Sequence, residues 1–341
     1  MTHALVLMKA MPPTKGHERL IDFALWFAGS GVVYLDTADD EPMIQERVSW
    51  INRQLVLSDW HLHWGEFDDQ DPKAEGFWER WADRLKEVGD FDVVIGSEDY
   101  CEKVAEVIGA RYIPYDPNRE LDNSRGTVAR RNLWDNFDQV STDFQYSLRT
   151  TVTVWGAEST GKTTLSKALA HTLDGEWVFE WARPYLEGTH QTVADLSAMH
   201  DIWHGQYAVE LNAYQHAADK RFIVRDTDLF STIGYWEQPH WESELGEVPM
   251  ELIAQAKTNK ADLYIITSSN IPFEADPLRY GGDHRESPDE YWISVAEKYG
   301  LNYVVLTDPT RPGRLAAARC AAVEAFLKKN QALMYYDRKG Q

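Results

Sequence analysis

The chain has 341 residues, of which 43% are hydrophobic and 12% aromatic, and its formal net charge is −21 at pH 7. This length and apolar content suit two folded domains and exclude an intrinsically disordered chain. The negative charge argues against a general nucleic-acid or membrane surface, because both reward basic patches. Two cysteines, Cys101 and Cys320, cannot form a disulfide framework. With no signal peptide or membrane-length apolar run, we expect a cytoplasmic protein.

Strands and helices are expected to alternate through the first part of the chain. The expected strands are 4–8, 31–35, 61–64, 91–95 and 110–115, and the expected helices are 18–28, 43–57, 74–88, 100–108 and 127–137. Such alternation is typical of a parallel sheet with helices on both faces. Ligands of these sheets bind beyond the carboxyl ends of the strands, so we expect a site in the loops that follow them.

A polar run at 138–149 is interpreted as a linker, after which a second alternation begins. Its expected strands are 151–155, 176–179, 222–225, 262–267 and 302–306, with the longest helix at 193–219 and a closing helix at 312–328. The sequence therefore predicts an α/β fold with two doubly wound parallel-sheet domains. Their expected limits are 1–145 and 149–330, followed by a loose tail at 331–341.

The most specific motif follows the first strand of the second domain. Residues 156–164 read Gly-Ala-Glu-Ser-Thr-Gly-Lys-Thr-Thr and match G-x-x-x-x-G-K-[ST] between an expected strand and an expected helix. The glycines let backbone N–H groups surround an anion, and the helix presents its positive end to that anion. Lys162 would reach the β/γ phosphates of ATP, and the Thr163 hydroxyl would ligate Mg²⁺. The ATP-binding residues assigned from this loop are Gly156, Glu158, Ser159, Thr160, Gly161, Thr163 and Thr164.

Charged residues follow the later strands of this domain. Asp226 ends the strand at 222–225 and is the expected Mg²⁺ partner, while Asp228 would either bind substrate or cap the next helix. Glu180 follows the strand at 176–179, where a carboxylate could take the proton of an attacking hydroxyl. The neighbouring Trp181 and Arg183 are assigned to the substrate. Arg279 would lie in a lid and stabilise the transferring phosphoryl group, or else be a solvated loop arginine.

Two separated motifs mark the first domain. Residues 14–17 read Thr-Lys-Gly-His directly after the first strand, and residues 126–130 read Gly-Thr-Val-Ala-Arg at the start of a later helix. They resemble the (H/T)-x-G-H and G-T-x-x-R signatures of the nucleotidylyltransferase superfamily. The resemblance implies a Rossmann-like domain that transfers the adenylyl group of ATP. It also implies catalytic roles for Thr14, His17 and Arg130. ATP binding is then assigned to Lys9, Lys15, Gly16, Gly126 and Thr127.

Two further resemblances concern the nicotinamide-mononucleotide (NMN) members of that superfamily. Glu46-Arg47 resembles an E-R pair that binds phosphate, so Arg47 is assigned to the substrate; the alternative is a solvated helix face. Residues 77–81 resemble a family helix, in which Trp78 or Trp81 could stack on a nicotinamide ring. Core packing is the alternative for these tryptophans.

Across residues 3–328, the order and spacing of all these motifs resemble the NadR-type bifunctional enzymes. The resemblance implies that the second domain, a P-loop kinase, phosphorylates nicotinamide riboside to NMN. It implies that the first domain adenylylates NMN, giving NAD and pyrophosphate. The cofactors would be ATP and Mg²⁺, and the partners nicotinamide riboside, NMN, ATP and NAD, with no nucleic acid and no membrane. The sequence does not determine the oligomeric state, so a homo-oligomer is possible.

The sequence also departs from the family pattern in its first loop. Met8 replaces a glycine, Thr14 replaces a histidine, and Ser124-Arg125 precedes Gly126 where Ile-Ser is common. A second hypothesis therefore keeps the kinase and makes the first domain a degenerate sensor that binds NAD or NMN. A third hypothesis is a non-catalytic nucleotide-driven switch, which Lys162, Glu180 and Asp226 together disfavour.

Overall fold

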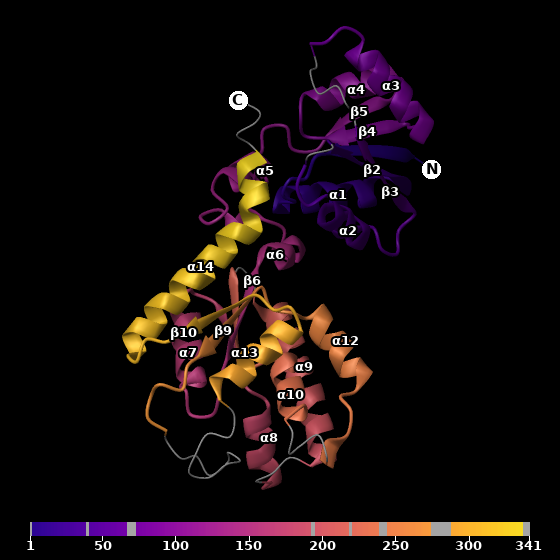
Figure 1. The fold of residues 1–341 in the computed structure, drawn as a ribbon. Helices are drawn as coiled ribbons and strands as arrows, with labels where there is room; N and C mark the ends of the chain where they lie inside the picture. The colour runs from indigo at the N-terminus through magenta and orange to yellow at the C-terminus, as the bar shows by residue number, and fades with distance from the viewer. Residues whose placement is uncertain are drawn as a thin grey trace. The chain divides into compact units, whose positions relative to one another are not determined.

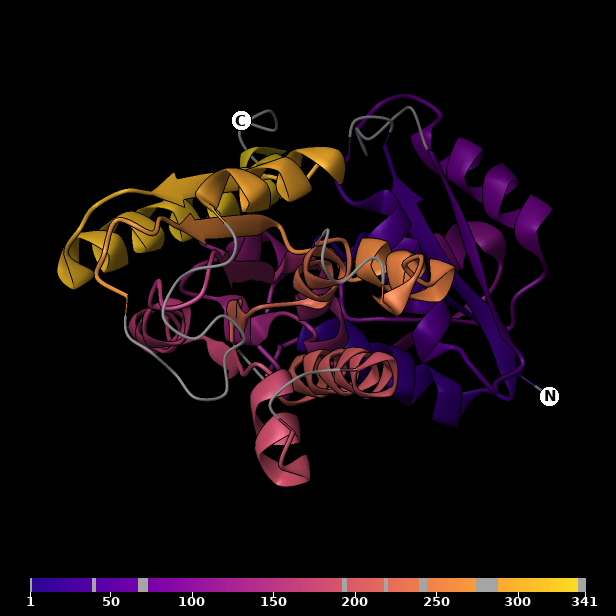
Figure 2. The same ribbon diagram turned by 60° about the horizontal axis from the view of Figure 1, so that its bottom comes forward.

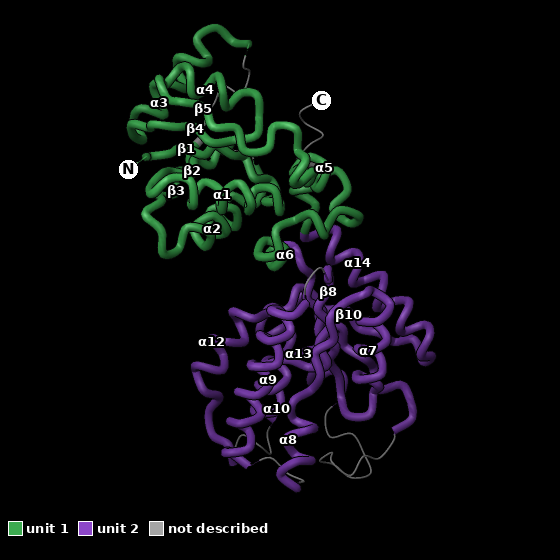
Figure 3. Tube along the Cα trace, turned by 180° about the vertical axis from the view of Figure 1, so that it is seen from behind, with its two compact units in different colours: residues 1–147, 330–341 green, residues 148–329 purple. Residues whose placement is uncertain are grey.

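The computed structural model describes residues 2–38, 41–66, 73–191, 195–217, 220–238, 244–273 and 288–336. The chain divides into two compact units, one of residues 1–147 with 330–341 and one of residues 148–329 (Figure 1; Figure 3). Each unit contains one five-stranded sheet, and every described strand pair in both sheets is parallel. The expected α/β class with two parallel sheets is confirmed.

Unit 1 has the strand order β3-β2-β1-β4-β5. The strands are β1 (His3–Met8), β2 (Ser30–Thr37), β3 (Trp60–Glu66), β4 (Val93–Gly96) and β5 (Arg111–Pro114). The helices between them are α1 (Lys15–Phe27), α2 (Ile44–Gln54), α3 (Phe77–Val88) and α4 (Tyr100–Ile108). The chain winds from β1 out to β3 and then returns to place β4 on the other side of β1. This reversal creates a crevice at the carboxyl ends of β1 and β4.

Helices cover both faces of the unit 1 sheet, with α1 and α2 on one face and α3 and α4 on the other (Figure 1). On the second face Leu5, Leu7 and Tyr34 of the strands pack with Trp81 of α3 and Val104 of α4. Because both faces are covered, β1 is buried at every residue from Ala4 to Met8.

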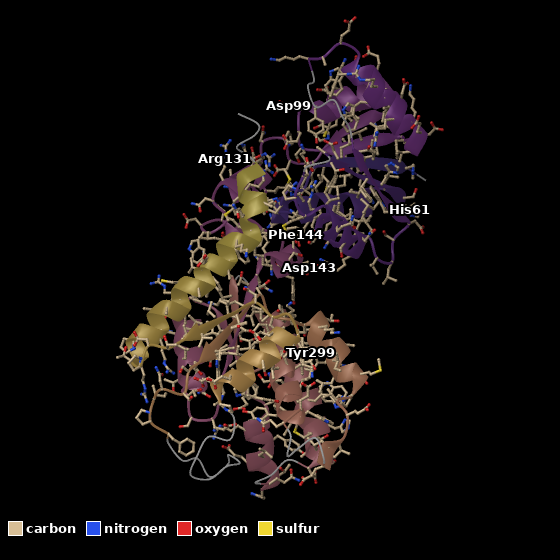
Figure 4. The ribbon with its side chains drawn as sticks, viewed as in Figure 1. His61, Asp99, Arg131, Asp143, Phe144 and Tyr299 are labelled. Carbon is tan, nitrogen blue, oxygen red and sulfur yellow. The ribbon has the colours of Figure 1, made fainter. Side chains whose placement is uncertain are left out.

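The polar run expected to be a linker is largely helical, which corrects that interpretation. It contains a 3₁₀ turn, η1 (Phe137–Gln139), and α6 (Thr142–Leu148), and the helix expected at 127–137 is only α5 (Gly126–Arg131). Some of its polar side chains form buried hydrogen bonds within unit 1. Ser141 is fully buried, accepts a hydrogen bond from Trp50 Nε1 at 2.7 Å and donates one to Glu18 Oε1 at 2.6 Å. Figure 4 shows the next residues, Asp143 and Phe144, on α6.

Unit 2 has the strand order β10-β9-β6-β8-β7. Its strands are β6 (Thr150–Trp155), β7 (Glu176–Val178), β8 (Phe222–Asp226), β9 (Leu263–Thr267) and β10 (Tyr303–Leu306). Its helices are α7 (Lys162–Thr172), α8 (Ala182–Thr189), α9 (Leu196–His216), α10 (Leu229–Trp236), α12 (Met250–Thr258), α13 (Asp289–Lys298) and α14 (Arg311–Tyr336).

The two faces of this sheet carry different helices (Figure 1). Trp155 and Tyr264 face a large core with Trp203 of α9, Trp236 of α10 and Trp292 of α13. On the other face α7 packs along β6 and β8, and α14 brings Phe326 against Phe222. The closing helix was expected to end at 328 but extends to Tyr336, so α14 is longer than α9. None of the helices in the described ranges is long and apolar enough to cross a bilayer.

A buried ion pair links α9 to β8. Arg225 Nη1 lies 3.1 Å from Glu210 Oε2, and both side chains are fully buried. Arg225 also donates to the backbone oxygen of Asn259 at 2.8 Å, and Gln206 Nε2 donates to Glu210 Oε1 at 3.1 Å. Removing one member of such a pair leaves the other as an uncompensated buried charge.

We therefore expect Arg225→Met to lower the free energy of unfolding of unit 2 by about 3 to 5 kcal/mol. Arg319→Met, at an exposed position on α14, should change it by less than about 0.5 kcal/mol. Adding Glu210→Gln to Arg225→Met should restore part of the loss, because the amide needs no counter-charge. Urea titration followed by circular dichroism measures all three, and equal stability of Arg225→Met and Arg319→Met would contradict the role of the pair.

Candidate functional site

A cavity of about 370 Å³ lies in unit 1 beyond the carboxyl ends of β1 and β4. Both separated motifs contribute to it. The sequence-assigned residues that line the cavity are Lys9, Thr14, Gly16, His17, Gly126, Thr127 and Arg130. Met8 also lines it and is 3% exposed. The crevice at the topological switch point is therefore the place where the motifs meet.

His17 is fixed by Thr14, the residue that precedes α1. The Thr14 backbone N–H donates to His17 Nδ1 at 3.0 Å, and the Thr14 hydroxyl lies 2.8 Å from the same nitrogen. Because Nδ1 accepts from a backbone N–H, the proton of the neutral ring belongs on Nε2. Burial, together with the positive charges of Arg119 and Arg47, lowers the pKa of His17 to about 4. His17 is thus a neutral hydrogen-bond donor at pH 7.

Contacts between the two motifs explain how they form one site. Gly16 N donates to Ser124 Oγ at 3.0 Å, and Arg130 Nη1 donates to the carbonyl oxygen of Met11. A Cβ on Gly126 would lie 2.9 Å from that same carbonyl oxygen, so only glycine fits at the start of α5. Helix α5 begins at Gly126, and its N-cap is Arg125.

Arg47, Trp78 and Trp81 do not line the cavity, although the sequence assigned them to the substrate. Arg47 is fully buried and donates to Glu41 Oε2 at 2.8 Å and to the Lys9 carbonyl oxygen at 2.6 Å. It therefore supports the cavity loop from beneath, and the alternative of a solvated helix face is wrong. Trp81 belongs to the apolar core of the sheet, and Trp78 packs against that core. Lys15 is exposed at the start of α1.

The sequence analysis left several charged residues of the cavity unassigned, among them Glu98, Asp116 and Arg119. Glu98 pairs with Arg119. Asp116 accepts hydrogen bonds from the backbone N–H groups of Glu120, Leu121 and Asp122 at 2.9, 3.1 and 3.2 Å. An aspartate just after an expected strand, followed by polar residues, is the pattern of such a side-chain-stabilised loop and was the available signal.

In unit 2 the phosphate-loop motif has the expected strand–turn–helix setting, between β6 and α7. Gly156 has φ 137° and Gly161 has φ 83°, values that favour glycine. A Cβ on Gly156 would also lie 2.6 Å from the Thr267 carbonyl oxygen. Lys162 Nζ donates to the carbonyl oxygens of Gly156 and Ala157 at 3.0 and 2.9 Å. Its ammonium group therefore lies across the mouth of the loop.

Arg314, which the sequence analysis also missed, holds this loop. Arg314 is 4% exposed and lies near the start of α14. Its Nη1 donates to the Thr160 carbonyl oxygen at 3.0 Å, and its Nη2 donates to the Ser268 carbonyl oxygen at 2.8 Å. It joins the loop to the end of β9. No short-range pattern could indicate this contact, because 154 residues separate Arg314 from Thr160.

The carboxylates assigned to this unit have different surroundings. Asp226 is the buried last residue of β8, beside Val154 of β6. Asp228 caps α10: its Oδ1 accepts from Ser231 N at 3.1 Å and its Oδ2 accepts from Tyr264 OH at 2.9 Å. Asp228 therefore caps the helix, which was the alternative to a substrate-binding role.

The remaining assignments follow β7. Glu180 and Trp181 come directly after this strand at its carboxyl end, and both are half-buried. Arg183 lies on α8, 3.8 Å from Glu187. Thr163 is in the first turn of α7. Arg279 lies outside the described residues.

Within the described residues, no group of three or more His, Cys, Asp or Glu side chains could hold a metal ion by itself. Thr163 and Asp226 offer only hard oxygen atoms. This donor set fits Mg²⁺ held mainly through phosphate oxygens and water better than a metal in an all-protein cage.

A family model described as an AAA domain matches residues 151–314. Two curated relatives are each named trifunctional NAD biosynthesis/regulator protein NadR. The protein from Salmonella typhimurium strain LT2 is 22% identical over 289 residues, which cover 80% of this chain and 68% of that protein. The protein from Escherichia coli strain K12 is 24% identical over 276 residues, which cover 77% of this chain and 65% of that protein.

Two solved structures share the fold along nearly the whole chain. A NadR protein in complex with NR is 19% identical, with a TM-score of 0.65 and 96% of each chain covered. A NadR protein in complex with NAD and AMP-PNP is 18% identical, with a TM-score of 0.65, and the match covers 97% of this chain and 96% of that chain. At these identities the likeness concerns the fold, including the order of its two units.

The low pKa of His17 predicts a loss of stability in acid. The folded-state pKa of about 4 lies below the unfolded value of about 6.5. The stabilisation is therefore complete above pH 6.5 and is lost as the pH falls toward 4. We expect the His17 ring to titrate near pH 4 in an NMR titration. Between pH 7.5 and 5, wild-type protein should lose more unfolding free energy than His17→Asn; equal losses would contradict the assignment.

Proposed function

We propose that this chain, which shares its fold with two NadR structures along nearly its whole length and is 22% identical to a curated NadR protein, is a bifunctional transferase of NAD biosynthesis. Unit 2 would phosphorylate nicotinamide riboside with ATP to give NMN. Unit 1 would transfer the adenylyl group of a second ATP to NMN, giving NAD and pyrophosphate. The single observation that carries the proposal is that each unit has its own phosphate-binding turn at the carboxyl edge of its own parallel sheet. We also propose that these two units are the two functional domains.

For the kinase, the 5′-hydroxyl oxygen of the riboside attacks the γ-phosphorus of ATP while the bond to the ADP oxygen breaks. Lys162 and the backbone N–H groups of the loop would hold the β/γ phosphates. Glu180 would accept the hydroxyl proton. Arg314 does not touch substrate in this scheme; it keeps the Thr160 carbonyl turned away from the phosphates, so that the loop presents N–H groups to the anion.

Mg²⁺ fits the oxygen donors of this unit, and Thr163 and Asp226 are the residues that would hold it. When bound, the ion neutralises charge on the β- and γ-phosphate oxygens. Arg279 remains a proposed lid residue for the same phosphoryl group, and Arg183 and Trp181 are proposed to contact the riboside.

For adenylyl transfer, a phosphate oxygen of NMN attacks the α-phosphorus of ATP while the bond to pyrophosphate breaks. Such chemistry needs position and charge neutralisation rather than a protein nucleophile. His17 Nε2–H would donate to the α-phosphate as negative charge develops, and Thr14 holds the ring in that orientation. Lys9, Arg130 and the start of α5 would receive the departing pyrophosphate.

The second hypothesis keeps the kinase but makes the first domain a degenerate sensor of NAD or NMN. It differs from the proposal in one respect: unit 1 would bind these nucleotides without catalysing adenylyl transfer. The His17–Thr14 geometry and the cavity favour catalysis over that hypothesis. Incubation of the wild-type protein with nicotinamide riboside, ATP and Mg²⁺, with separation of the products, tests both. NMN followed by NAD supports the proposal, NMN alone supports the sensor hypothesis, and neither product contradicts both.

Lys162→Ala should abolish the formation of NMN from nicotinamide riboside, because the β/γ phosphates lose their cation. It should leave the adenylylation of supplied NMN at the wild-type rate, since the cavity of unit 1 is unchanged. Coupled assays of ADP and pyrophosphate measure the two steps separately. Loss of both activities in a folded variant would contradict two independent sites.

His17→Ala should lower kcat/KM for adenylylation of NMN by at least about a hundredfold, the usual cost of removing one preorganised donor. Phosphorylation of nicotinamide riboside by the same preparation is the internal control and should not change. Adenylylation within about threefold of wild type would show that another group stabilises the α-phosphate.

A further inference from the structure

Glu158 is an unusual residue for its position. It lies inside the loop that must surround a polyanion, and it is only 9% exposed. A carboxylate at this position repels the phosphates of ATP, because like charges interact strongly where water is limited. The repulsion is avoided if the carboxylate points at a group other than the phosphates. The loop motif alone assigned Glu158 to ATP, but the surrounding contacts indicate a different partner.

Tyr235 holds Glu158 on one side of the loop. The Tyr235 hydroxyl donates to Glu158 Oε1 at 3.3 Å. Tyr235 belongs to α10, the helix that follows Asp226 at the end of β8. Its ring meets the ring of Trp292 in an edge-on contact with centroids 5.1 Å apart, which fixes the phenol. The Glu158 carboxylate is therefore held toward α10.

The loop has two chemically different sides. On the β9 side Arg314 joins the Thr160 and Ser268 carbonyl oxygens. On the other side Asp226 ends β8, Glu158 follows β6 and Glu180 follows β7, and these three strands are neighbours in the sheet. Helices α8, α9 and α10 gather there, with α9 packed against both others (Figure 1; Figure 2). Carboxylates thus lie on the side where, in the proposed kinase reaction, Glu180 would meet the phosphoryl acceptor.

An aromatic ring is also fixed on the acceptor side. The Trp181 backbone N–H donates to Gln206 Oε1 at 3.0 Å, and the indole lies over Gly205 of α9. A Cβ at Gly205 would be only 1.8 Å from Trp181 Nε1, so the ring lies directly on the helix backbone. Indole faces attract cations as well as flat rings.

We propose that Glu158, oriented by Tyr235, selects a nucleoside with a positively charged base. The proposal deepens the kinase function above and rests on it. The oxidised pyridinium ring of nicotinamide riboside carries one positive charge, whereas the reduced dihydropyridine ring and the usual nucleobases are neutral. The Glu158 carboxylate attracts the charged ring but has no charge–charge attraction to a neutral ring. It is therefore a specificity-determining residue for the acceptor.

The test compares two acceptors of nearly identical shape, nicotinamide riboside and its reduced dihydro form, which differ by the ring charge. Wild-type kcat/KM should favour the oxidised form. Glu158→Gln keeps an oxygen for the Tyr235 hydroxyl and removes only the charge. It should reduce the preference about tenfold, the scale of one charge contact near a protein surface. The change should appear as a higher KM for the oxidised form alone.

Two further variants sharpen the result. Tyr235→Phe should lower the preference in the same direction by a smaller factor, because it releases the carboxylate without removing it. Glu324→Gln, at an exposed position on α14, removes the same charge from the same unit and should leave the preference unchanged. Thermal melting and the KM for ATP confirm that each variant retains a folded ATP site.

The outcomes separate this inference from the function on which it rests. Wild-type protein that phosphorylates neither acceptor would overturn the kinase proposal itself. Phosphorylation of both acceptors with no wild-type preference would overturn the inference alone. An equal loss on both acceptors in Glu158→Gln would also overturn it, because Glu158 would then act on ATP or on the loop.

Discussion

The structure depends on one constraint, which both units meet: a parallel strand must end, turn and start a helix with its backbone N–H groups aimed at an anion. In unit 1 Gly16 and Gly126 bring two such turns together over the crevice between β1 and β4. In unit 2 Gly156 and Gly161 form one such turn after β6. Because a helix N-terminus carries partial positive charge, each turn is suited to bind phosphate through its backbone.

The side chains around the turns divide into those that face the anion and those that hold the backbone. Arg47 and Arg314 are cations of the second kind: each is buried and donates to carbonyl oxygens of its loop. A buried guanidinium suits this task because its planar donors can satisfy several carbonyls at once. In the proposed function the neutral His17 ring would face the α-phosphate in unit 1. In unit 2 the Lys162 ammonium would exchange its hydrogen bonds to the Gly156 and Ala157 carbonyl oxygens for the β/γ phosphates.

Local patterns predicted the central strands β1, β6, β8 and β9 well, because strands buried on both faces are short apolar runs bounded by turn residues. The stretch at 138–149 was misjudged because polar composition alone does not show whether a segment is solvated or buried. Its polar residues suggest a solvated linker, yet Ser141 is buried between Trp50 and Glu18. Asp226 and Asp228 are equally plausible in sequence, and only the contacts of Asp228 with Ser231 and Tyr264 reveal it as a cap.

The sequence by itself determined the two phosphate-binding motifs, the β–α alternation around them and the order of the two units, since each is encoded in residues close together in the chain. The tertiary structure alone decided which charged residues face a ligand. Arg314 and Thr160 are 154 residues apart, and Tyr235 and Glu158 are 77 residues apart. Such contacts depend on strand order and helix packing, so no local pattern reports that Glu158, inside the best motif of the chain, is hydrogen-bonded by Tyr235 of α10.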